Sequence, residues 1–562
     1  MNEPAQASAR RTALTKVSIA VAIACGAMAA AYAAIGGLEG ATLLYARFRR
    51  VAPLPNRAVA WNQGPSVPAG PRKPNILVIL VDDMGYNDIT LNGGGVADGA
   101  VPTPHINSIA LDGVNCAQAY AGNATCSPSR AALMTGRYGT RFGFEFTSVP
   151  INFSRIIGRH VGNSVHKPIY HREREKDVPP YPTQGLPPGE ITLAQLLSAA
   201  DYHTLHLGKW HLGESPEFQP QNRGFAESLG YLAGASLHAD PRSPDVVNAV
   251  QDFDPVDAFL WAAEPRGVRY NGGPVCDIKG PTMTDYLTDE AIAAFEANRN
   301  RPFFMYLAYS APHSPLQAAK SDYDALPQIE DHALRVYAAM IRSLDRNVGR
   351  LLAALDEKGL AQDTLVVFTS DNGGANYLAL DDLNKPFRGW KATFFEGGLR
   401  IPFFVRWPAK LPRGTTFAKP VTHVDIYATA AAAAGVPVPA DRVMDGRNLL
   451  PLVEGVDRTP PHEALFWRSG PYRAVRVGDW KLQVSETPAK RWLFNLADDP
   501  TEQKNLADSL PEKVAELAKT LAGIDAEQAR PLWPALIEAP VLIDKPMGRP
   551  VNASDEYIYW SN

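Results

Sequence analysis

Two apolar runs, each followed by a pair of acidic or amide residues, constrain the fold of this 562-residue chain more than any other feature. Residues 75–81 are β-branched or leucine at almost every position and precede an Asp-Asp pair, and residues 364–370 precede an Asp-Asn pair. Short apolar runs without alternation are typical of parallel strands that are buried on both faces. Because such strands are covered by helices on each side, the chain is predicted to belong to the α/β class.

The side chains that follow these two runs make a candidate metal site. Asp82 and Asp83 follow the first run, and Asp371 and Asn372 follow the second. Three carboxylates and one amide oxygen are hard ligands, which suit Ca²⁺ or Mg²⁺ and argue against Zn²⁺. The alternative is that these residues form turns or cap helices, which is the more common use of aspartate at a strand end.

A candidate nucleophile lies in the run Cys126-Ser-Pro-Ser-Arg130, which is followed by an apolar stretch and Thr-Gly-Arg. Pro128 suits the first turn of a helix, so we expect a helix to begin at or beside the cysteine. Positions 126 and 130 then lie one turn apart on the same face, and the Arg130 guanidinium is expected to reach the oxyanion that Cys126 attacks. The alternative is a buried cysteine on an ordinary helix.

Three further motifs place cationic or imidazole side chains at predicted strand or loop ends. In the string Gly-Lys-Trp-His-Leu-Gly, Lys209 and His211 would point to the same side of an extended backbone and share a pocket. His313 lies between two prolines that follow the strand-like run 302–310, and Lys391 lies between Arg-Gly-Trp and a later Glu-Gly-Gly-Leu-Arg-Ile-Pro block. Each residue alone has a plainer alternative, as a solvated strand end or a hydrogen-bonded loop histidine.

Together these motifs resemble the type I sulfatases, the arylsulfatase-like enzymes of the alkaline phosphatase superfamily. The Cys-Ser-Pro-Ser-Arg run is similar to the signature at which a formylglycine-generating enzyme oxidises the cysteine to Cα-formylglycine, and Gly-Lys-Trp-His-Leu-Gly is similar to a second signature. The resemblance implies that the hydrate of the aldehyde at residue 126 attacks the sulfur of a sulfate monoester. The products would be an alcohol or phenol and inorganic sulfate.

The resemblance also implies a role for each candidate residue. The metal ion, expected to be Ca²⁺ with Mg²⁺ as the alternative, would be bound by Asp82, Asp83, Asp371, Asn372 and the modified side chain of Cys126. The expected catalytic residues are Cys126, Arg130, Lys209, His211, His313 and Lys391. The cationic side chains would hold the sulfate group, His313 with Lys391 would stabilise the leaving oxygen, and His211 would assist release of sulfate from residue 126.

Two other functions remain as alternatives. A phosphate or phosphonate ester hydrolase of the same superfamily shares the nucleophile and the metal ligands, so these residues do not separate sulfur from phosphorus. A non-catalytic binder of sulfated glycans is more remote, because a binder has no need of Cys126. The motifs also leave the ester open, whether it is an aryl sulfate, a small alkyl sulfate or a glycan sulfate.

The expected domain organisation follows from the motifs and from changes in composition. Residues 75–455 are predicted to form the catalytic domain, for which the resemblance implies an alkaline-phosphatase-like α/β/α sandwich with a large, mostly parallel sheet. Residues 456–562 resemble the C-terminal subdomain of the family, a small α+β unit with an antiparallel sheet. Within it, residues 472–482 favour a hairpin and residues 512–524 a helix. The net charge of −4 gives no indication of a nucleic-acid partner.

The N-terminus differs from the rest of the chain. Residues 1–46 are predicted to be a signal peptide or a membrane anchor, because the uncharged stretch 17–38 is long enough to cross a bilayer but only weakly apolar. Ala31-Tyr-Ala offers a possible peptidase site, so a cleaved signal competes with a retained anchor. Both alternatives place the enzyme outside the cytoplasm, in the periplasm or a comparable compartment. Residues 47–74, which contain six prolines, are predicted to be an extended linker.

Two smaller features allow alternatives. Cys25 lies in the hydrophobic segment and Cys126 is the nucleophile, so Cys116 and Cys276 remain for one disulfide. The stretch from Arg155 to Lys176 is rich in His, Arg and Lys. It is expected to be either a solvated surface insertion or a rim that admits an anionic or polyhydroxylated substrate.

Overall fold

The computed structural model describes residues 54–562 except 69, 71–72, 160–164, 264–265 and 458. The predicted signal peptide or anchor and the first part of the predicted linker therefore lie outside the described residues. Within the described part of the chain, no helix has both the length and the apolar character that are needed to cross a bilayer.

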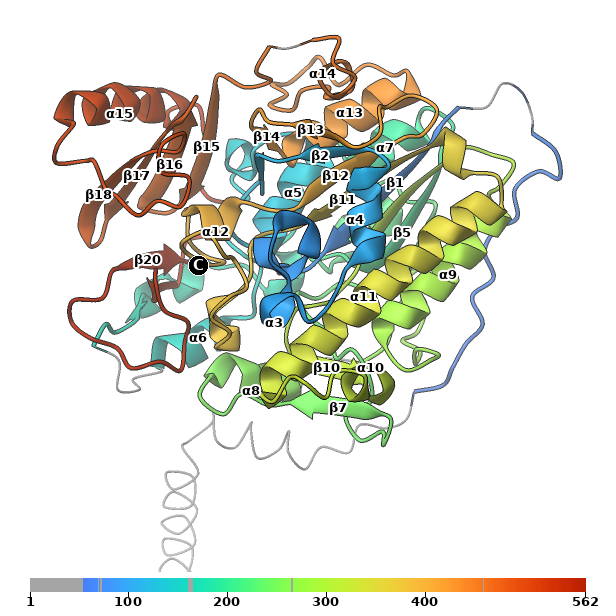
Figure 1. Cartoon of the computed structure of the whole chain (residues 1–562), viewed down its shortest axis with the longest axis horizontal. Helices are drawn as coiled ribbons and strands as arrows, with labels where there is room; N and C mark the ends of the chain where they lie inside the picture. The colour runs from blue at the N-terminus through green and yellow to red at the C-terminus, as the bar shows by residue number, and fades with distance from the viewer. Residues whose placement is uncertain (1–53, 69, 71–72, 160–164, 264–265, 458) are drawn as a thin grey trace, which may run out of the picture. The chain divides into compact units, whose positions relative to one another are not determined.

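A nine-stranded sheet forms the centre of the fold (Figure 1). Its spatial order is β13 (Thr415–Phe417), β2 (Val114–Cys116), β12 (Phe403–Arg406), β11 (Thr364–Ser370), β1 (Asn75–Val81), β9 (Phe303–Ala308), β5 (His203–Lys209), β6 (Glu227–Tyr231) and β8 (Arg269–Tyr270). The strands from β11 to β6 are all parallel, whereas β12 and β8 are antiparallel to them. The two apolar runs predicted as buried strands are β1 and β11, which pair with each other along their full length.

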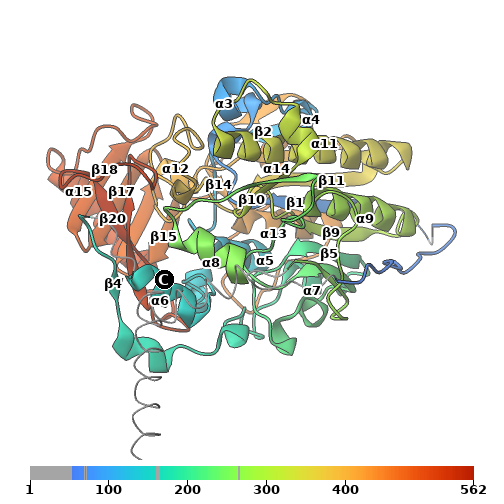
Figure 2. The same ribbon diagram turned by 90° about the horizontal axis from the view of Figure 1, so that it is seen from below.

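Both faces of this sheet are buried beneath helices, as parallel strands require. Ile79 of β1 belongs to a cluster with residues of α4 (Pro104–Leu111), α9 (Met283–Ala297) and α11 (His332–Glu357). The neighbouring Val78 points the other way, to α5 (Cys126–Thr135), α7 (Leu193–Ser198) and α13 (Val424–Ala434). Figure 2 shows the strands between these two helical layers. The predicted α/β/α sandwich is confirmed.

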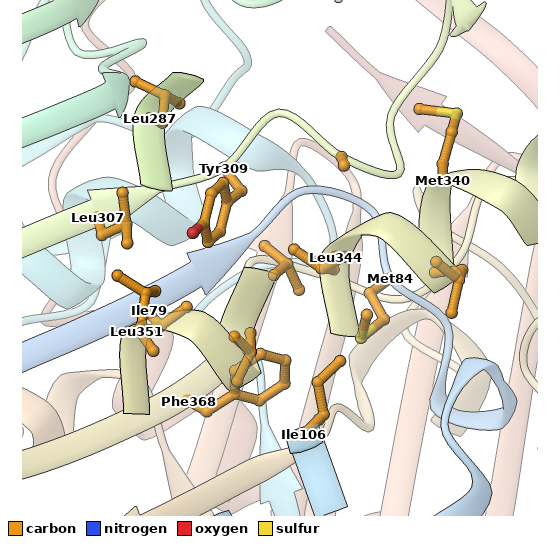
Figure 3. Packing of buried hydrophobic residues seen from close by; sticks show 14 of the residues in the cluster. Ile79, Met84, Ile106, Leu287, Leu307, Tyr309, Met340, Leu344, Leu351 and Phe368 are labelled. Atoms are coloured by element: carbon orange, nitrogen blue, oxygen red, sulfur yellow. The ribbon is translucent and has the colours of Figure 1, made fainter. Parts of the chain in front are cut away.

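Figure 3 shows the core on one face of the sheet. Ile79, Leu307 and Phe368 come from three neighbouring strands and meet Leu287 of α9 and Leu344 of α11. All five side chains are fully buried. Burying one large apolar side chain contributes about 1.5–3 kcal/mol, so this layer is a major source of the stability that holds the strand ends in place.

The C-terminal part of the chain forms a smaller α+β unit. Its four-stranded antiparallel sheet joins β15 (Ala464–Ser469), β16 (Tyr472–Val477), β17 (Trp480–Glu486) and β18 (Ala489–Asn495). The predicted hairpin is β16 and β17, with Gly478 in the turn at a φ of 57°. The predicted helix is α15 (Pro511–Asp525), whose Leu517 packs on the sheet.

Shorter elements connect and cover these units. Two-stranded sheets join β10 (Leu316–Ala319) to β7 (Val246–Ala249) and β14 (Val421–Thr422) to β3 (Ala119–Tyr120). In the described part of the chain, the other α-helices are α3 (Val96–Gly99), α6 (Ile151–Arg159), α8 (Pro255–Ala263), α10 (Lys320–Asp324), α12 (Glu396–Leu399) and α14 (Leu450–Val453).

The basic stretch Arg155–Lys176 packs onto the C-terminal unit. Within it, β4 (Ile169–Tyr170) pairs with β19 (Ile537–Leu542), which in turn pairs with β20 (Tyr557–Ser561). Arg155 Nη2 lies 2.7 Å from Glu175 Oε2, so part of the positive charge is paired within the stretch. A role of this stretch in substrate selection stays a prediction.

Two expectations about the chain outside the core need correction. The described part of the predicted linker is not a free spacer, because it packs against the catalytic domain. Trp61 is buried, and its Nε1 donates to Glu290 Oε2 at 3.0 Å. The amide of Asn62 donates to Glu227 Oε1, also at 3.0 Å. The disulfide between Cys116 and Cys276 does not form. Cys116 ends β2 and Cys276 bridges to Val268 beside β8, so the two thiols lie towards opposite edges of the nine-stranded sheet.

Candidate active site

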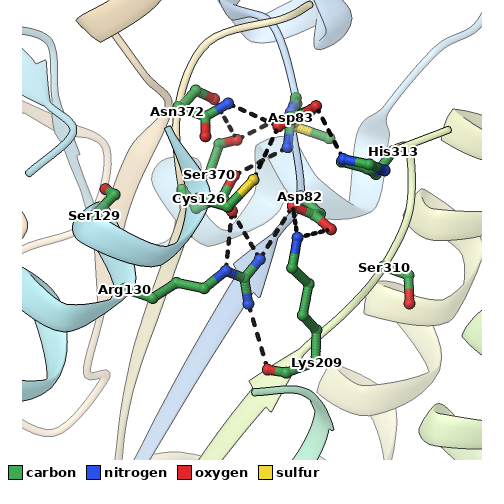
Figure 4. Close-up of polar contacts among 12 residues, drawn as sticks. Asp82, Asp83, Cys126, Ser129, Arg130, Lys209, Ser310, His313, Ser370 and Asn372 are labelled. Atoms are coloured by element: carbon green, nitrogen blue, oxygen red, sulfur yellow. Dashed lines mark hydrogen bonds and ion pairs between the residues drawn. The ribbon is translucent and has the colours of Figure 1, made fainter. Parts of the chain in front are cut away.

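The carboxyl ends of four parallel strands bring the candidate residues together at one edge of the sheet (Figure 4). In chain order, these strands end at or just before Asp82 and Asp83, Lys209, His313, and Asp371 and Asn372. Open parallel sheets present their ligand sites at this edge, because the carboxyl ends of neighbouring strands all reach it. Every one of these side chains is buried.

Helix α5 presents Cys126 at its first turn. The helix begins at Cys126, as predicted, and ends at Thr135, and it is capped by Gly136, whose φ of 67° lies in the left-handed region. A side chain at position 136 would also lie 2.7 Å from Cβ of Tyr427, which explains the glycine of the Thr-Gly-Arg motif. The first-turn backbone N–H groups have no partner within the helix, so this end of α5 favours negative charge.

The Cys126 thiol lies between a cation and a carboxylate. Its Sγ is 3.2 Å from Lys391 Nζ and 3.8 Å from Asp83 Oδ1. Burial raises the pKa of the thiol, but the charges of Lys209 and Lys391 outweigh burial and bring the pKa below its ordinary value. The geometry therefore favours an anionic group at position 126.

Arg130 is buried against the carboxylates of Asp82 and Asp371. Its side chain is fully buried, its Nε and Nη2 donate to Asp371 Oδ2 at 3.0 and 2.8 Å, and Nη2 also donates to Asp82 Oδ1 at 3.2 Å. The Arg130 guanidinium therefore holds the carboxylates of Asp82 and Asp371 in place. Its Nη1 makes one longer contact, to the Lys209 carbonyl oxygen at 3.4 Å. A role of this guanidinium at the oxyanion attacked at residue 126 stays a prediction.

Lys209 forms a buried ion pair with Asp82. Its Nζ donates to both carboxylate oxygens, at 2.8 and 2.7 Å. Burial raises the pKa of Asp82 to about 7, although the Lys209 charge opposes that shift. Gly208 places the lysine there, because its φ is 98° and a Cβ at this position would lie 1.9 Å from the Ala308 carbonyl oxygen on the next strand.

Asp83 is the residue on which most contacts converge. Its Oδ1 accepts from Asn372 Nδ2 at 2.8 Å, its Oδ2 accepts from Lys391 Nζ at 2.7 Å, and its amide donates to Asp371 Oδ1 at 3.0 Å. Burial raises the pKa of Asp83, but the charges of Lys391 and His313 outweigh burial and hold the pKa below its ordinary value. Asp83 is therefore ionised at neutral pH.

His211 differs from the expectation of an extended backbone. Strand β5 ends at Lys209, and His211 has a φ of 58°, so the two side chains do not alternate as they would along a strand. Burial, and after it the charge of Lys209, lower the pKa of His211 well below its ordinary value. His211 Nε2 lies 3.0 Å from the Ser148 carbonyl oxygen, and Nδ1 has no hydrogen-bond partner among the described residues.

His313 contacts the Asp83 carboxylate. Its Nε2 is 3.5 Å from Asp83 Oδ2, and its Nδ1 contacts the Ser314 carbonyl oxygen. Burial lowers the pKa of His313, but the negative charges of Asp83 and Asp82 outweigh burial and raise the pKa above its ordinary value. The two histidines of the site therefore have pKa values shifted in opposite directions.

Sequence reasoning missed two residues that contact the site. The Tyr377 hydroxyl donates to Asp83 Oδ2 at 2.7 Å, and His238 Nε2 donates to the His313 carbonyl oxygen at 2.9 Å. Neither residue stands in a motif with recognisable spacing, so only the folded loops reveal them. Glu396, in contrast, stands in the recognisable Glu-Gly-Gly block but does not contact the site. It forms ion pairs with Lys481 and Arg400.

The donor atoms fit a hard divalent cation. Ligand atoms of Asp82, Asp83, Cys126 and His313 all lie within 4.8 Å of one another. Asn372 Oδ1 is buried and has no hydrogen-bond partner in the described part of the chain, which is costly unless another group fills that role. The carboxylates of Asp82 and Asp83 and the amide oxygen of Asn372 are hard donors of the kind that Ca²⁺ and Mg²⁺ take, whereas Cys126 Sγ and the His313 ring nitrogen are softer.

Comparison with known families agrees with this geometry. The family model described as Sulfatase matches residues 74–436, which cover all the candidate site residues. A second family model, described as N-sulphoglucosamine sulphohydrolase, C-terminal, matches residues 388–527.

Individual relatives cover most of the chain. Steryl-sulfatase of Mus musculus is 32% identical over 76% of this chain and 72% of its own length. N-acetylgalactosamine-6-sulfatase of Homo sapiens is 31% identical over 74% of this chain and 73% of its own. Among solved structures, Ps i-CgsB in complex with k-i-k-neocarrahexaose is 30% identical, covers 82% of this chain and 95% of its own, and has a TM-score of 0.67. The chain therefore belongs to the sulfatase family of the alkaline phosphatase superfamily and is a sulfate ester hydrolase.

Proposed function

We propose that this sulfatase cleaves sulfate monoesters with a formylglycine made from Cys126 and with the help of a divalent cation. The observation that carries the proposal is the position of Cys126 Sγ, which lies 3.2 Å from Lys391 Nζ and 3.8 Å from Asp83 Oδ1 at the first turn of a buried helix. Residue 126 thus lies between a cation that suits a sulfate oxygen and a carboxylate that suits a metal. This arrangement favours attack on an anionic group that is held by fixed charges.

The proposed metal ligands are Asp82, Asp83, Asp371, Asn372 and the modified side chain of residue 126. The buried, unpartnered Asn372 Oδ1 supports this set. The family resemblance favours Ca²⁺, with Mg²⁺ as the alternative. A bound divalent cation would polarise the sulfate oxygens and lower the pKa of a hydroxyl at residue 126. Arg130 and Lys209 hold Asp371 and Asp82 in place for this purpose.

The two histidines are proposed to divide the acid and base roles. His211 Nε2 faces a carbonyl oxygen, which only accepts, so Nε2 carries the proton and Nδ1 is a free acceptor. The depressed pKa keeps His211 neutral at neutral pH, which suits a base that removes a proton from residue 126. His313, with its raised pKa, suits the acid that protonates the leaving oxygen. Opposite shifts of this kind are typical of acid and base pairs.

The proposal is tested at residue 126 itself. Mass spectrometry of the tryptic peptide that contains residue 126 should show conversion of the thiol to the aldehyde. Cys126→Ala should remove almost all turnover of an aryl sulfate, and the matched control Cys276→Ala, at another buried free cysteine, should retain it. A wholly unoxidised residue 126 in a fully active enzyme would overturn the proposal.

Substrate preference needs its own comparison. The cationic side chains of Arg130, Lys209 and Lys391 are compatible with either a sulfate or a phosphate group. Turnover of an aryl sulfate and of the matching aryl phosphate should therefore be measured side by side. We expect the sulfate to be the better substrate. Because the relatives are named for steryl and amino-sugar sulfates, both belong in the substrate panel.

We also propose that the enzyme is exported, with residues 1–46 acting as a signal peptide or as a retained anchor. The support is the uncharged stretch 17–38 behind basic residues. Cell fractionation with N-terminal sequencing of the mature chain separates the two alternatives. Recovery of the intact chain in the cytoplasm would contradict export.

A further inference from the structure

Tyr377 places a hydroxyl group between the two residues that flank Cys126. Its Oη donates to Asp83 Oδ2 at 2.7 Å and accepts from Lys391 Nζ at 3.1 Å. Lys391 Nζ in turn donates to Asp83 Oδ2 at 2.7 Å. The three polar groups therefore form a closed triangle of hydrogen bonds, and the phenol is the only one of them that is uncharged.

The triangle determines the direction of the Lys391 ammonium. An ammonium has three N–H donors. Two of them meet Asp83 and Tyr377, and the contact with Cys126 Sγ at 3.2 Å uses the third. Without the phenol oxygen, one donor would lose its partner and the ammonium would be free to turn away from residue 126. The ammonium is largely buried, with 11% of the Lys391 side chain exposed, so bulk water replaces the lost partner poorly.

The loop that carries Tyr377 is fixed from both sides. The residue before it, Asn376, accepts a hydrogen bond at its carbonyl from the Met547 amide at 2.9 Å. The residue after it, Leu378, accepts one from Gln251 Nε2, also at 2.9 Å. Both donors come from segments distant in sequence. The phenol is therefore held at the site by the tertiary structure before any substrate arrives.

We propose that Tyr377 is a positioning residue of the sulfatase reaction, which holds the Lys391 ammonium against residue 126 and the Asp83 carboxylate in its metal-binding orientation. The inference rests on the proposed roles of Lys391 and Asp83. Groups that hydrogen-bond to metal ligands typically contribute about 10–100-fold to metal affinity or activity. A residue that only packs the loop would contribute through its ring, whereas this role depends on the hydroxyl.

The decisive variant is Tyr377→Phe, which removes the hydroxyl and keeps the ring beside His313 and Lys391. At saturating Ca²⁺ and aryl sulfate we expect kcat to fall by about tenfold, with KM little changed. The Ca²⁺ concentration that half-saturates the thermal shift of the protein should rise by about tenfold, a readout that needs no turnover. The matched control is Tyr270→Phe, which removes the phenol hydrogen bond to Glu227 at the far edge of the sheet and should change neither quantity by more than about twofold.

A double-mutant cycle with Lys391→Ala tests whether the hydroxyl acts through the ammonium. In the Lys391→Ala background, the loss of kcat on adding Tyr377→Phe should shrink to less than about threefold. Equal losses in both backgrounds, or a Tyr377→Phe enzyme within about twofold of the wild type in kcat and Ca²⁺ response, would overturn the inference. A fully active Lys391→Ala enzyme would instead overturn the proposed function of Lys391, so the two failures are distinguishable.

Discussion

The ammonium group of Lys209 illustrates how single residues set the charge of the site. It contacts both oxygens of Asp82, and the two side chains are almost completely buried. Buried pairs of this kind are costly to break, because the remaining charge is left without a partner. Without Lys209, the Asp82 carboxylate would still contact Arg130, at 3.2 Å.

Lys209→Ala should therefore lower kcat towards an aryl sulfate by on the order of a hundredfold or more, since loss of one preorganised charged donor costs about 2.7–4 kcal/mol. Steady-state kinetics at saturating Ca²⁺ measure the effect. Lys358→Ala, which removes a surface ammonium paired with Glu296, is the control and should leave kcat unchanged. A Lys209→Ala enzyme within threefold of the wild type would contradict the role.

Residue types and spacing were enough to predict which side chains meet at the site, but not how each one is oriented. Asp82, Asp83 and Asn372 follow strands whose apolar pattern is unambiguous, so their position at the sheet edge follows directly. His211 was misjudged because its left-handed backbone depends on tertiary contacts that no local pattern encodes. Tyr377 was missed for a similar reason, since its loop takes its conformation from distant segments.

At the scale of secondary structure, strands were predicted more sharply than irregular segments. Runs 75–81 and 364–370 match β1 and β11 residue for residue, because an uninterrupted apolar run has clear ends at the first polar pair. Helix α15 extends one residue beyond each end of the predicted range 512–524. Segment 54–68 was misjudged because its proline content indicated a spacer, whereas Trp61 provides enough apolar surface to fix it.

A buried charge cluster joins the catalytic domain to the C-terminal sheet. Lys481 Nζ on β17 lies 2.8 Å from Glu396 Oε1 on α12 and 3.0 Å from Glu502 Oε1. One ammonium thus serves two carboxylates. Burial raises the pKa of Glu502 to about 7, whereas the charges of Lys481 and Arg400 outweigh burial and lower the pKa of Glu396 to about 2.

The raised pKa of Glu502 predicts that the free energy of unfolding depends on pH. The unfolded chain loses the Glu502 proton near pH 4.5, but the folded protein keeps it to about pH 7, so the contribution of Glu502 is lost as the pH rises through this window. The Tm of the wild type relative to Glu502→Gln should therefore fall between pH 5 and pH 8, as measured by calorimetry. Glu296→Gln is the control, because its hydrogen bond to Lys358 lowers the pKa of Glu296 and moves its titration below this range. Parallel Tm profiles for the wild type and Glu502→Gln would contradict the assignment.

For the whole molecule, metal binding should be visible as stability. The proposed ligands directly follow strands β1 and β11 in the middle of the sheet and include residue 126 of α5, so a bound ion ties two core strands and a helix together. An ion present at a hundred times its Kd stabilises a fold by about 2.7 kcal/mol. Chelation should therefore lower the Tm and abolish turnover, and Ca²⁺ should restore both.

Asn372→Ala provides the control for this experiment, because it removes the unpartnered amide oxygen. The variant should show a much weaker Tm response to Ca²⁺. A wild-type Tm that is indifferent to both chelator and Ca²⁺ would contradict the proposed metal set.

The residues that build the site lie far apart in the sequence, from Asp82 to Lys391. Helix α12, which follows Lys391, is held by residues as late as Glu502, whose carboxylate accepts from the Glu396 amide. A nascent chain that ends before Glu502, or a proteolytic fragment without Asp82, lacks part of this arrangement. Ester cleavage therefore requires a folded chain that extends from Asp82 past Glu502. In a refolding experiment, turnover would return only when these distant segments have packed together, which is later than the first collapse of the chain.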